Sequence, residues 1–517
     1  MTLVLVSSQF IGQMLSWADS SVSDVASTLS IPEIILKGVM MLAGIWLLLE
    51  IGFFMIIHFF VLPNAQTLSK PQPYHGDMLQ MMKRAADLVK QLHCYSFDKY
   101  LSGFCCGANF EDIHLENWRS FLAWAMYTKH LPDLDAKELE DLEVVNEYAQ
   151  KEHPIMRTMK PGFNPAVKHC RMTMDPIPII HRPLLMYVLI RLKESFTNNF
   201  FLTSMGFQFL EVDGQTYWYK AQGSKDSNAS NTGVSGTGSN GSEPMLFLHG
   251  ISTGWGSYIN MALGMGQGRS IFLVDMDSVK LNSLVFKMPT PQQFSDKVSK
   301  ILDRHHVDRV SVVGHSFGSI TAGWFIRHFP ERVSHLTLID PVSMLLSFPE
   351  VAFSFLYRKP STVMEWVIHI FAAREITISH TLRRNFWWYN NDLWLETIPA
   401  HIGVVVGLAT GDEIINPKAL EEYVGNCRTS RIRQRESAST ESARTEALLA
   451  KADSFSELDN AQHNTTPSKT NATSEVAMIE CLIWEKFSHG QILCDSQSLD
   501  VLMATVRSNE KLGTRSL

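Results

Sequence analysis

A buried-strand pattern that ends directly in a Gly-x-Ser-x-Gly turn constrains the fold of this chain more than any other feature. Residues 310–313 are Val-Ser-Val-Val, and the turn Gly-His-Ser-Phe-Gly at 314–318 leads at once into an apolar helical pattern over 317–329. The two glycines leave room for a sharp turn that holds the serine in a strained backbone conformation and lifts its hydroxyl out of the sheet. This context predicts that Ser316 is a nucleophile.

Short apolar runs alternate with helical patterns through the C-terminal half of the chain. A Val-Asp-Gly-Gln turn within 207–221 separates two such runs and predicts a hairpin. The other predicted strands are at 245–248, 270–275, 310–313, 336–339, 403–408 and 478–484, and the predicted helices at 292–305, 317–329 and 498–506. Strands that alternate with helices predict an α/β fold, with a mostly parallel sheet and helices on both faces.

The strand order and the serine turn resemble the α/β-hydrolase family over about residues 207–506. A His-Gly pair follows the predicted strand at 245–248 and resembles the family's oxyanion loop. In that family one oxyanion donor is the backbone N–H after the nucleophile, here Phe317, and the other follows His-Gly, here Ile251. The resemblance therefore implies an oxyanion hole at Ile251 and Phe317, with His249 as a structural loop histidine.

The same resemblance implies a catalytic acid and a base. Asp412 follows a Val-rich predicted strand, where the family carries the carboxylate that orients the histidine. Asp340, at the end of the preceding core strand, is the alternative acid, because some members of the family place theirs there. His489 lies in a Ser-His-Gly loop after the last predicted strand and is the expected base. The chain order Ser316, Asp412, His489 is that of the family.

The core pattern is interrupted over 342–400, where the family inserts a helical cap above its active site. Aromatic residues crowd this segment, which predicts packing and, beneath the cap, an apolar pocket for an acyl chain. They are Phe348, Phe353, Phe355, Tyr357, Trp366, Phe371, Phe386, Trp387, Trp388, Tyr389 and Trp394.

A long apolar segment near the N-terminus predicts a transmembrane helix at 34–63, after an N-terminal segment at 1–33. Its apolar runs are long enough for a hydrocarbon core of ~30 Å, and Pro63 is expected to end it. Glu50 near its middle costs roughly 3 kcal/mol on the insertion scale, which the surrounding apolar side chains can offset. A buried or interfacial helix is the alternative.

Charge around this segment predicts its orientation. No Lys or Arg precedes it, whereas Lys70, Lys83 and Arg84 follow, so the catalytic part is expected in the cytosol. Four glycosylation sequons in Ser/Thr-rich stretches leave a lumenal orientation as the alternative, and the organelle is undetermined. They begin at Asn228, Asn240, Asn464 and Asn471.

Composition divides the rest of the chain. Residues 64–205 have helical periodicity and no catalytic constellation, so a helical region is expected before a hydrolase domain at 206–517. Two polar stretches in that domain, at about 223–243 and 428–474, have too few large apolar residues to form a core and are expected to be disordered.

Taken together, the sequence predicts a membrane-anchored serine hydrolase that cleaves an ester of a lipid or another hydrophobic acid. The net charge of −7 does not indicate a basic surface, so nucleic acid is not an expected partner. No metal or organic cofactor is implied, and the oligomeric state is undetermined. An acyltransferase, suggested by the spacing of His335 and Asp340, and a non-catalytic lipid-binding protein are the alternatives.

Overall fold

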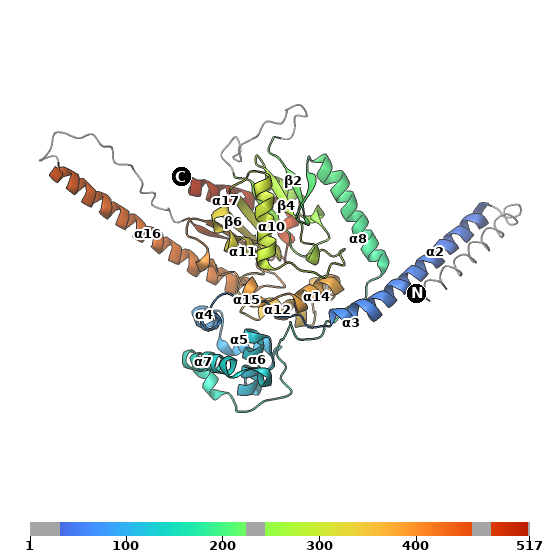
Figure 1. Cartoon of the computed structure of the whole chain (residues 1–517), viewed down its shortest axis with the longest axis horizontal. Helices are drawn as coiled ribbons and strands as arrows, with labels where there is room; N and C mark the ends of the chain where they lie inside the picture. Colours follow the sequence, from blue (N-terminus) through green and yellow to red (C-terminus); the bar gives the residue numbers. More distant parts are fainter. Residues whose placement is uncertain (1–30, 224–242, 457–476, 515–517) are drawn as a thin grey trace. The chain divides into compact units, whose positions relative to one another are not determined.

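The computed structural model of the chain describes residues 31–223, 243–456 and 477–514 (Figure 1). It divides into two compact units. The first is Met1–Asn64 with Arg182–Met186, and the second is Ala65–His181 with Tyr187–Leu517. The second unit therefore contains both the helical region that precedes the sheet and the sheet itself.

The first unit contains the long apolar helix that the sequence predicts. Helix α2 (Ile31–Ile56) continues through a π-helical turn, η1 (Ile57–Val61), into α3 (Leu62–Ala65). Within it, Ile35–Ala65 has a mean hydropathy of 2.4 and is 6% buried, so its length and composition suffice to cross a membrane. The sequence predicts that the helix ends at Pro63. In the structure it continues to Ala65. The wider π turn just before the proline relieves the clash that its ring makes in a regular α-helix.

Glu50 is not a lone carboxylate in this helix. Its two oxygens accept the backbone N–H groups of Leu184, at 2.7 Å, and Leu185, at 2.9 Å, at the start of helix α8 (Leu184–Phe196). The indole of Trp46 donates to the same carboxylate at 3.1 Å. The first N–H groups of a helix lack partners and carry a partial positive charge, so these contacts reduce the cost of an acid in an apolar segment.

The described residues of the second unit form one sheet of eight strands in the order β1-β2-β4-β3-β5-β6-β7-β8. Strands β1 and β2 form the predicted hairpin, β2 is antiparallel to β4, and the remaining neighbours are parallel. The mostly parallel sheet is thus confirmed. The strands are β1 (Gln208–Val212), β2 (Gln215–Lys220), β3 (Met245–Leu248), β4 (Ile271–Val274), β5 (Val310–His315), β6 (Val333–Ile339), β7 (Gly403–Ala409) and β8 (Ile479–Trp484).

Both faces of the sheet are buried, which explains why its central strands are continuous apolar runs. Leu246 and Leu248 of β3 pack in one core cluster, and their neighbours Met245 and Phe247 pack in another, because successive side chains point to opposite faces. The first cluster includes residues of α10 (Pro291–Arg304), α11 (Gly318–His328) and α16 (Pro417–Ser456), and the second those of α9 (Ile259–Met265) and α17 (Ser496–Thr514).

A helical insertion joins β6 to β7 where the cap is predicted. It consists of α12 (Glu350–Ala352), η9 (Phe353–Tyr357), α13 (Val363–Ile368), η10 (His369–Ala373), α14 (Ile376–Arg384) and α15 (Trp388–Asn391). The helical region before the sheet contains α4 (Met78–Gln91), α5 (Phe97–Phe104), α6 (Leu115–Tyr127) and α7 (Ala136–Glu152). Its apolar faces join the same core cluster as the cap.

The prediction of disorder over the whole polar stretch at 428–474 is wrong for its first part. Residues 428–456 continue helix α16. The first turns of α16 bury Leu420, Tyr423 and Val424, and the guanidinium of Arg431 donates to the carbonyl of Ile402 at 2.7 Å. From Ile432 to Ser456 the sequence contains no glycine or proline, the residues that most disfavour a helix, so the helix can continue through this polar stretch. The rest of this stretch lies outside the described residues. So do residues 224–242 of the other polar stretch, at 223–243, and the four sequons.

Candidate active site

Ser316 lies in the turn between β5 and α11, at the carboxyl end of the sheet. Its backbone has a φ of 53°, in the left-handed region, and its N–H donates to the carbonyl of Ile339 at 2.9 Å. A side chain at Gly318 would clash with the carbonyl of Leu248, so the start of α11 can approach β3 this closely only with glycine. The turn has the strained geometry that the sequence predicts.

The imidazole of His489 bridges the serine and Asp412. Its Nε2 lies 2.8 Å from the Ser316 hydroxyl oxygen, and its Nδ1 lies 2.6 Å from Oδ2 of Asp412. The other oxygen of Asp412 accepts the backbone N–H groups of Ile414, at 2.7 Å, and Ile415, at 3.1 Å. These contacts fix the carboxylate so that Nδ1 donates to it and Nε2 is free to accept the serine proton.

Charge around the imidazole favours its protonated form. Burial opposes that charge, but the attraction and the hydrogen bond of Asp412, together with Asp340 and Glu413, raise the pKa of His489 to about 9. Glu413 also accepts the backbone N–H of His489 at 3.1 Å. The ring can accept the serine proton only in its neutral form, whose fraction increases as the pH rises toward 9, and the carboxylates then stabilise the charge that it gains.

Asp340, the alternative acid, contacts backbone rather than the imidazole. Its oxygens accept the N–H groups of Ala409, at 3.0 Å, and Gly490, at 2.8 Å. Burial raises the pKa of Asp340 to about 6 against the lowering effect of His489, and the charge of Asp412 adds to the increase. The geometry favours Asp412 as the partner of the imidazole, with Asp340 holding the loops on either side.

The spacing of Asp340, Asp412 and His489 would allow them to hold a metal ion. One possible ligand atom of each lies within 4.8 Å of the others. Each of these groups already has a hydrogen-bond partner: Nδ1 faces Asp412, and both oxygens of Asp340 accept backbone N–H groups. The donor set therefore fits a hydrogen-bonded acid–base pair.

The proposed oxyanion donors lie beside the serine. Ile251 and Phe317 line the same cavity as Ser316, and neither backbone N–H donates to another group in the described chain. A Cβ atom on Gly250 would lie 2.8 Å from Cβ of Ser316, so the loop approaches the nucleophile this closely only with glycine. The two N–H groups are thus available to an oxygen of a bound substrate.

Tyr258 fixes this loop, and the sequence interpretation missed it. Its hydroxyl accepts the N–H of Gly250 at 3.0 Å and lies 3.1 Å from Nδ1 of His315, to which it donates. Burial lowers the pKa of His315 well below its ordinary value, so the ring is a neutral acceptor. A tyrosine eight positions after a glycine leaves no pattern in a sequence, and only the fold brings them together.

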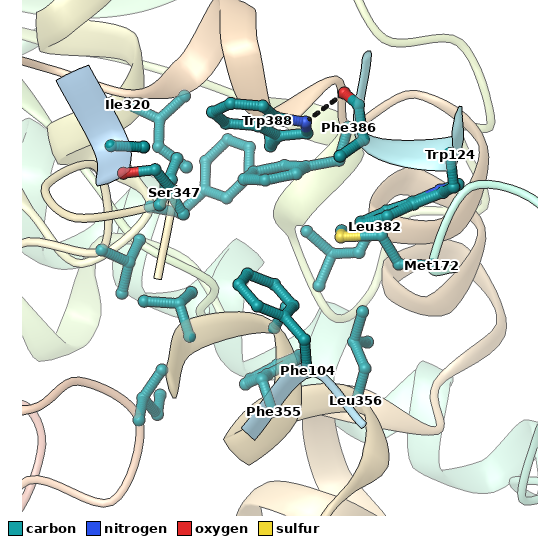
Figure 2. Close-up of a pocket in the computed structure, with 18 of the residues that line it drawn as sticks. Phe104, Trp124, Met172, Ile320, Ser347, Phe355, Leu356, Leu382, Phe386 and Trp388 are labelled. Atoms are coloured by element: carbon teal, nitrogen blue, oxygen red, sulfur yellow. Dashed lines mark hydrogen bonds between the residues drawn. The ribbon is translucent and has the colours of Figure 1, made fainter. Parts of the chain in front are cut away.

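An apolar cavity opens at the nucleophile (Figure 2). Its volume is about 70 Å3, several times the ~10–15 Å3 that one water needs. Of the aromatic cap residues, Phe355, Phe386 and Trp388 line it, whereas Trp366 and Phe371 are exposed. The cap thus contributes part of the apolar pocket that its composition predicts, and the helices before the sheet contribute the rest.

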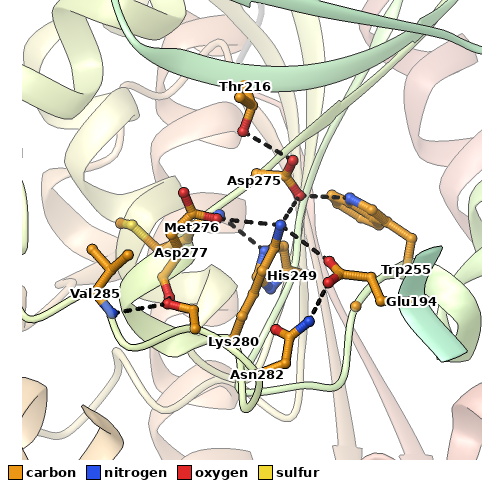
Figure 3. A network of polar contacts seen from close by, with 12 residues as sticks. Glu194, Thr216, His249, Trp255, Asp275, Met276, Asp277, Lys280, Asn282 and Val285 are labelled. Atoms are coloured by element: carbon orange, nitrogen blue, oxygen red, sulfur yellow. Dashed lines mark hydrogen bonds and ion pairs between the residues drawn. The ribbon is translucent and has the colours of Figure 1, made fainter. Parts of the chain in front are cut away.

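A cluster of charges around the buried Lys280 lies beside His249 (Figure 3). The ammonium group of Lys280 is 2.7 Å from Asp275, 3.3 Å from Asp277 and 3.4 Å from Glu194 of helix α8. The indole of Trp255 donates to Asp275 at 2.8 Å. Burial lowers the pKa of Lys280, but the three carboxylates outweigh it and raise that pKa above its ordinary value.

This cluster is joined to the loop through the backbone. Ser252 donates its N–H to Val279 at 3.2 Å and accepts that of Leu281 at 2.9 Å, on either side of Lys280. His249 accepts the N–H of Met276 at 3.0 Å through Nε2. His249 therefore has the structural position expected of it, and Lys280 is a second residue whose role the sequence does not reveal.

The spacing that suggested an acyltransferase does not form a site. His335 and Asp340 lie toward opposite ends of β6, five residues apart. An extended strand rises ~3.3 Å per residue, so they are separated by roughly 16 Å. His335 is buried, and it does not line the cavity that Ser316 lines.

Comparison with known proteins finds similarity over part of the chain. Residues 243–459 match the family model described as alpha/beta hydrolase fold. An abhydrolase domain-containing protein, abhd-5.2, of Caenorhabditis elegans is 27% identical over 135 residues, covering 25% of this chain and 29% of that protein. A human serine hydrolase-like protein is 31% identical over 84 residues, or 16% of this chain and 40% of the relative. The chain spans less than half the length of these relatives.

Solved structures are similar at lower identity. A membrane phospholipase A, a bacterial virulence factor, aligns over 63% of this chain and 97% of its own at 12% identity and a TM-score of 0.35. A carboxylesterase from Bacillus subtilis aligns over 62% and 97% at 12% identity and a TM-score of 0.34. The chain has the α/β-hydrolase fold, and its matched segments are similar to serine hydrolase-like proteins.

Proposed function

We propose that this chain is a membrane-anchored serine hydrolase that cleaves a carboxylic ester of a lipid or another hydrophobic acid. The observation that carries the proposal is the imidazole of His489, with Ser316 at 2.8 Å on one nitrogen and Asp412 at 2.6 Å on the other, at the mouth of an apolar cavity.

In the first half of the reaction the serine becomes acylated. Nε2 of His489 takes the hydroxyl proton while Oγ of Ser316 attacks the ester carbonyl carbon. The N–H groups of Ile251 and Phe317 stabilise the oxygen that becomes negative, at about 3 kcal/mol for each donor. The tetrahedral intermediate then collapses, and His489 gives its proton to the departing alcohol.

In the second half water takes the place of the alcohol. His489 removes a proton from water, the hydroxide attacks the acyl carbon, and the carboxylic acid leaves as Ser316 regains its proton. Asp412 holds the imidazole in the required tautomer and stabilises its charge in both halves.

The cavity supports an apolar acyl group rather than a charged one. Its walls are apolar side chains, and an alkyl chain gains about 0.8 kcal/mol for each methylene that it buries. The apolar helix Ile35–Ala65 supports a membrane anchor, and the excess of Lys and Arg after it favours a catalytic part in the cytosol.

Two assays test the proposal. A fluorophosphonate probe should label the wild-type chain and fail to label Ser316→Ala, and the purified protein should hydrolyse fatty acyl esters. Product analysis with and without a lipid alcohol separates hydrolysis from acyl transfer. A protein that neither reacts with the probe nor turns over any ester would be a non-catalytic member of the family, and the proposal would be wrong.

A further inference from the structure

The helical region before the sheet contributes a large part of the wall around the nucleophile's cavity. Eight of its residues line the cavity that Ser316 also lines. They come from α4 (Met82 and Ala85), α5 (Tyr100 and Phe104), α6 (Phe121, Trp124 and Ala125) and the segment that follows α7 (Met172). The sequence assigns no chemistry to these helices, yet the cavity is incomplete without them.

This wall presents carbon to the cavity, because its polar ring atoms have partners elsewhere. The indole of Trp124 donates to the hydroxyl of Thr173 at 2.9 Å, and the hydroxyl of Tyr100 donates to the carbonyl of Ser347 at 3.0 Å. Trp388 of the cap donates to the carbonyl of Ala125 at 2.8 Å (Figure 2). A surface with its hydrogen bonds already made favours a saturated hydrocarbon over a polar group.

The wall is fixed to the cap by packed aromatic rings and hydrogen bonds. The hydroxyl of Tyr95 donates to the carboxylate of Glu350. The ring of Phe348 packs edge-on against those of Tyr95 and Tyr100, with ring centroids 5.0 Å and 5.5 Å apart. A side chain at Gly103 would overlap Pro349, so α5 and the cap are in direct contact. The cavity is therefore enclosed between two elements that pack as one core.

The helical wall lies across the cavity from the nucleophile's helix. Figure 2 shows Ile320 of α11 and Ser347 on one side, and Trp124 and Met172 on the other. Because Ser316 lines the same cavity as these residues, a substrate whose carbonyl carbon is held at Ser316 would have its alkyl chain between the two sides. The position of the far wall then limits how many carbon atoms fit.

From these contacts we infer that residues 78–172 form the end wall of an acyl-chain site and set the length of the alkyl chain that Ser316 accepts. The inference rests on the proposed function and names its substrate class: esters of unbranched, unsubstituted fatty acids. Two alanines mark where the wall leaves room, Ala85 on α4 and Ala125 on α6, because a larger side chain at either position would occupy the space of the alkyl chain.

The test compares paired variants across p-nitrophenyl esters from acetate to palmitate. Ala85→Leu should lower the ratio of kcat/KM for palmitate to that for acetate by about tenfold or more, because the longer side chain displaces at least two methylenes. Ala86→Leu, one position along α4 and outside the cavity lining, should leave that ratio at the wild-type value. Phe104→Ala should move the preferred chain length upward, whereas Phe97→Ala, on the same helix but away from the cavity, should not.

Binding gives a readout that does not depend on hydrolysis. A fluorescent polyene fatty acid should bind Ser316→Ala protein, palmitate should displace it, and adding Ala85→Leu should weaken that binding about tenfold. If wild-type protein hydrolyses no ester but these affinities differ as expected, the proposed function fails and the wall stands. If Ala85→Leu and Ala86→Leu give the same ester ratio and the same affinity, the wall inference is wrong. Ala125→Val takes the place of Ala85→Leu if that variant does not fold.

Discussion

Asp340 accepts the backbone N–H of Gly490, the residue next to His489, at 2.8 Å. Its other oxygen accepts the N–H of Ala409 at the end of β7, at 3.0 Å, so a single buried carboxylate joins the loops on both sides of the proposed acid and base. Asp412 alone of the two acids meets the imidazole ring. Both carboxylates follow a core strand in the sequence, but they make different contacts. Asp412 binds the imidazole of His489, whereas Asp340 binds backbone N–H groups.

Substitution of the two acids should separate these tasks. Asp412→Asn should lower kcat by about four orders of magnitude, because an amide imposes the wrong tautomer on His489. Asp340→Asn keeps one carbonyl oxygen for one of the two N–H groups and should have a much smaller effect. Steady-state kinetics on a soluble ester measures both. If Asp340→Asn proves the more damaging change, Asp340 is the catalytic acid.

Loss of the nucleophile should abolish turnover without unfolding the protein. Ser316→Ala removes the attacking oxygen and leaves a small side chain in the turn between β5 and α11. Ester hydrolysis should fall below a few per cent of the wild-type rate, and circular dichroism should show an unchanged spectrum. Activity above that level would mean that another group attacks the substrate.

The pH dependence of kcat/KM should report the imidazole. Its base form must be neutral, and Asp412 raises the pKa of His489 to about 9, against the effect of burial. Activity on a stable ester should therefore rise with pH between 7 and 9. In Asp412→Asn the negative charge is removed, so the pKa of His489 falls and the rise should move to lower pH. An unshifted profile in that variant would contradict the pairing.

Much of the fold follows from local patterns, because each central strand is buried on both faces. The mostly apolar, Val-rich or short runs at β3, β5 and β7 are typical of strands covered on two sides, and the turn at Ser316 indicates which end of the sheet carries the chemistry. Asp412 and His489 were predicted by their resemblance to a family and their order along the chain. The structure brings their side chains together.

What the sequence could not predict are contacts between distant segments. Tyr258, Lys280 and the helical wall of the cavity act through neighbours that lie far away in sequence, and no spacing marks them. The helix beyond Arg431 was missed for a different reason. A low content of apolar residues predicts the absence of a core, but it does not exclude a helix that extends from a packed first half.

The buried ammonium group of Lys280 should be important for stability. Its side chain is 8% exposed and those of Asp275 and Glu194 are 4% and 3% exposed. Lys280→Met would leave Asp275 without its counter-charge in the described chain, and Glu194 with only the exposed Arg191 at 3.2 Å. The free energy of unfolding should fall by about 3–5 kcal/mol, measured by urea denaturation. Lys300→Met, which removes an exposed ion pair with Asp213, is the matched control and should have little effect. Equal stability of the two variants would exclude this role for Lys280.

Removal of residues 1–63 should separate membrane attachment from catalysis. The second compact unit begins at Ala65, and none of the proposed catalytic or oxyanion residues precedes Ile251. The shortened chain should hydrolyse a soluble short-chain ester, while its activity on a lipid in vesicles should fall further, because the anchor raises the local concentration of that substrate. Hydrolysis of both substrates reduced to the same extent would argue against an anchoring role.

Extraction of the full-length chain tests the anchor directly. A helix that crosses the bilayer stays with membranes at high pH in carbonate, whereas a peripheral protein is released. We expect Ile35–Ala65 to retain the full chain in the membrane pellet and the 1–63 deletion to appear in the supernatant. The deletion variant could be retained only by a second apolar surface, and the exposed Leu189, Leu192 and Phe196 of α8 are the residues to replace with serine in that case. If carbonate strips the intact chain from membranes, this helix does not span the bilayer, and the anchor fails independently of the hydrolase.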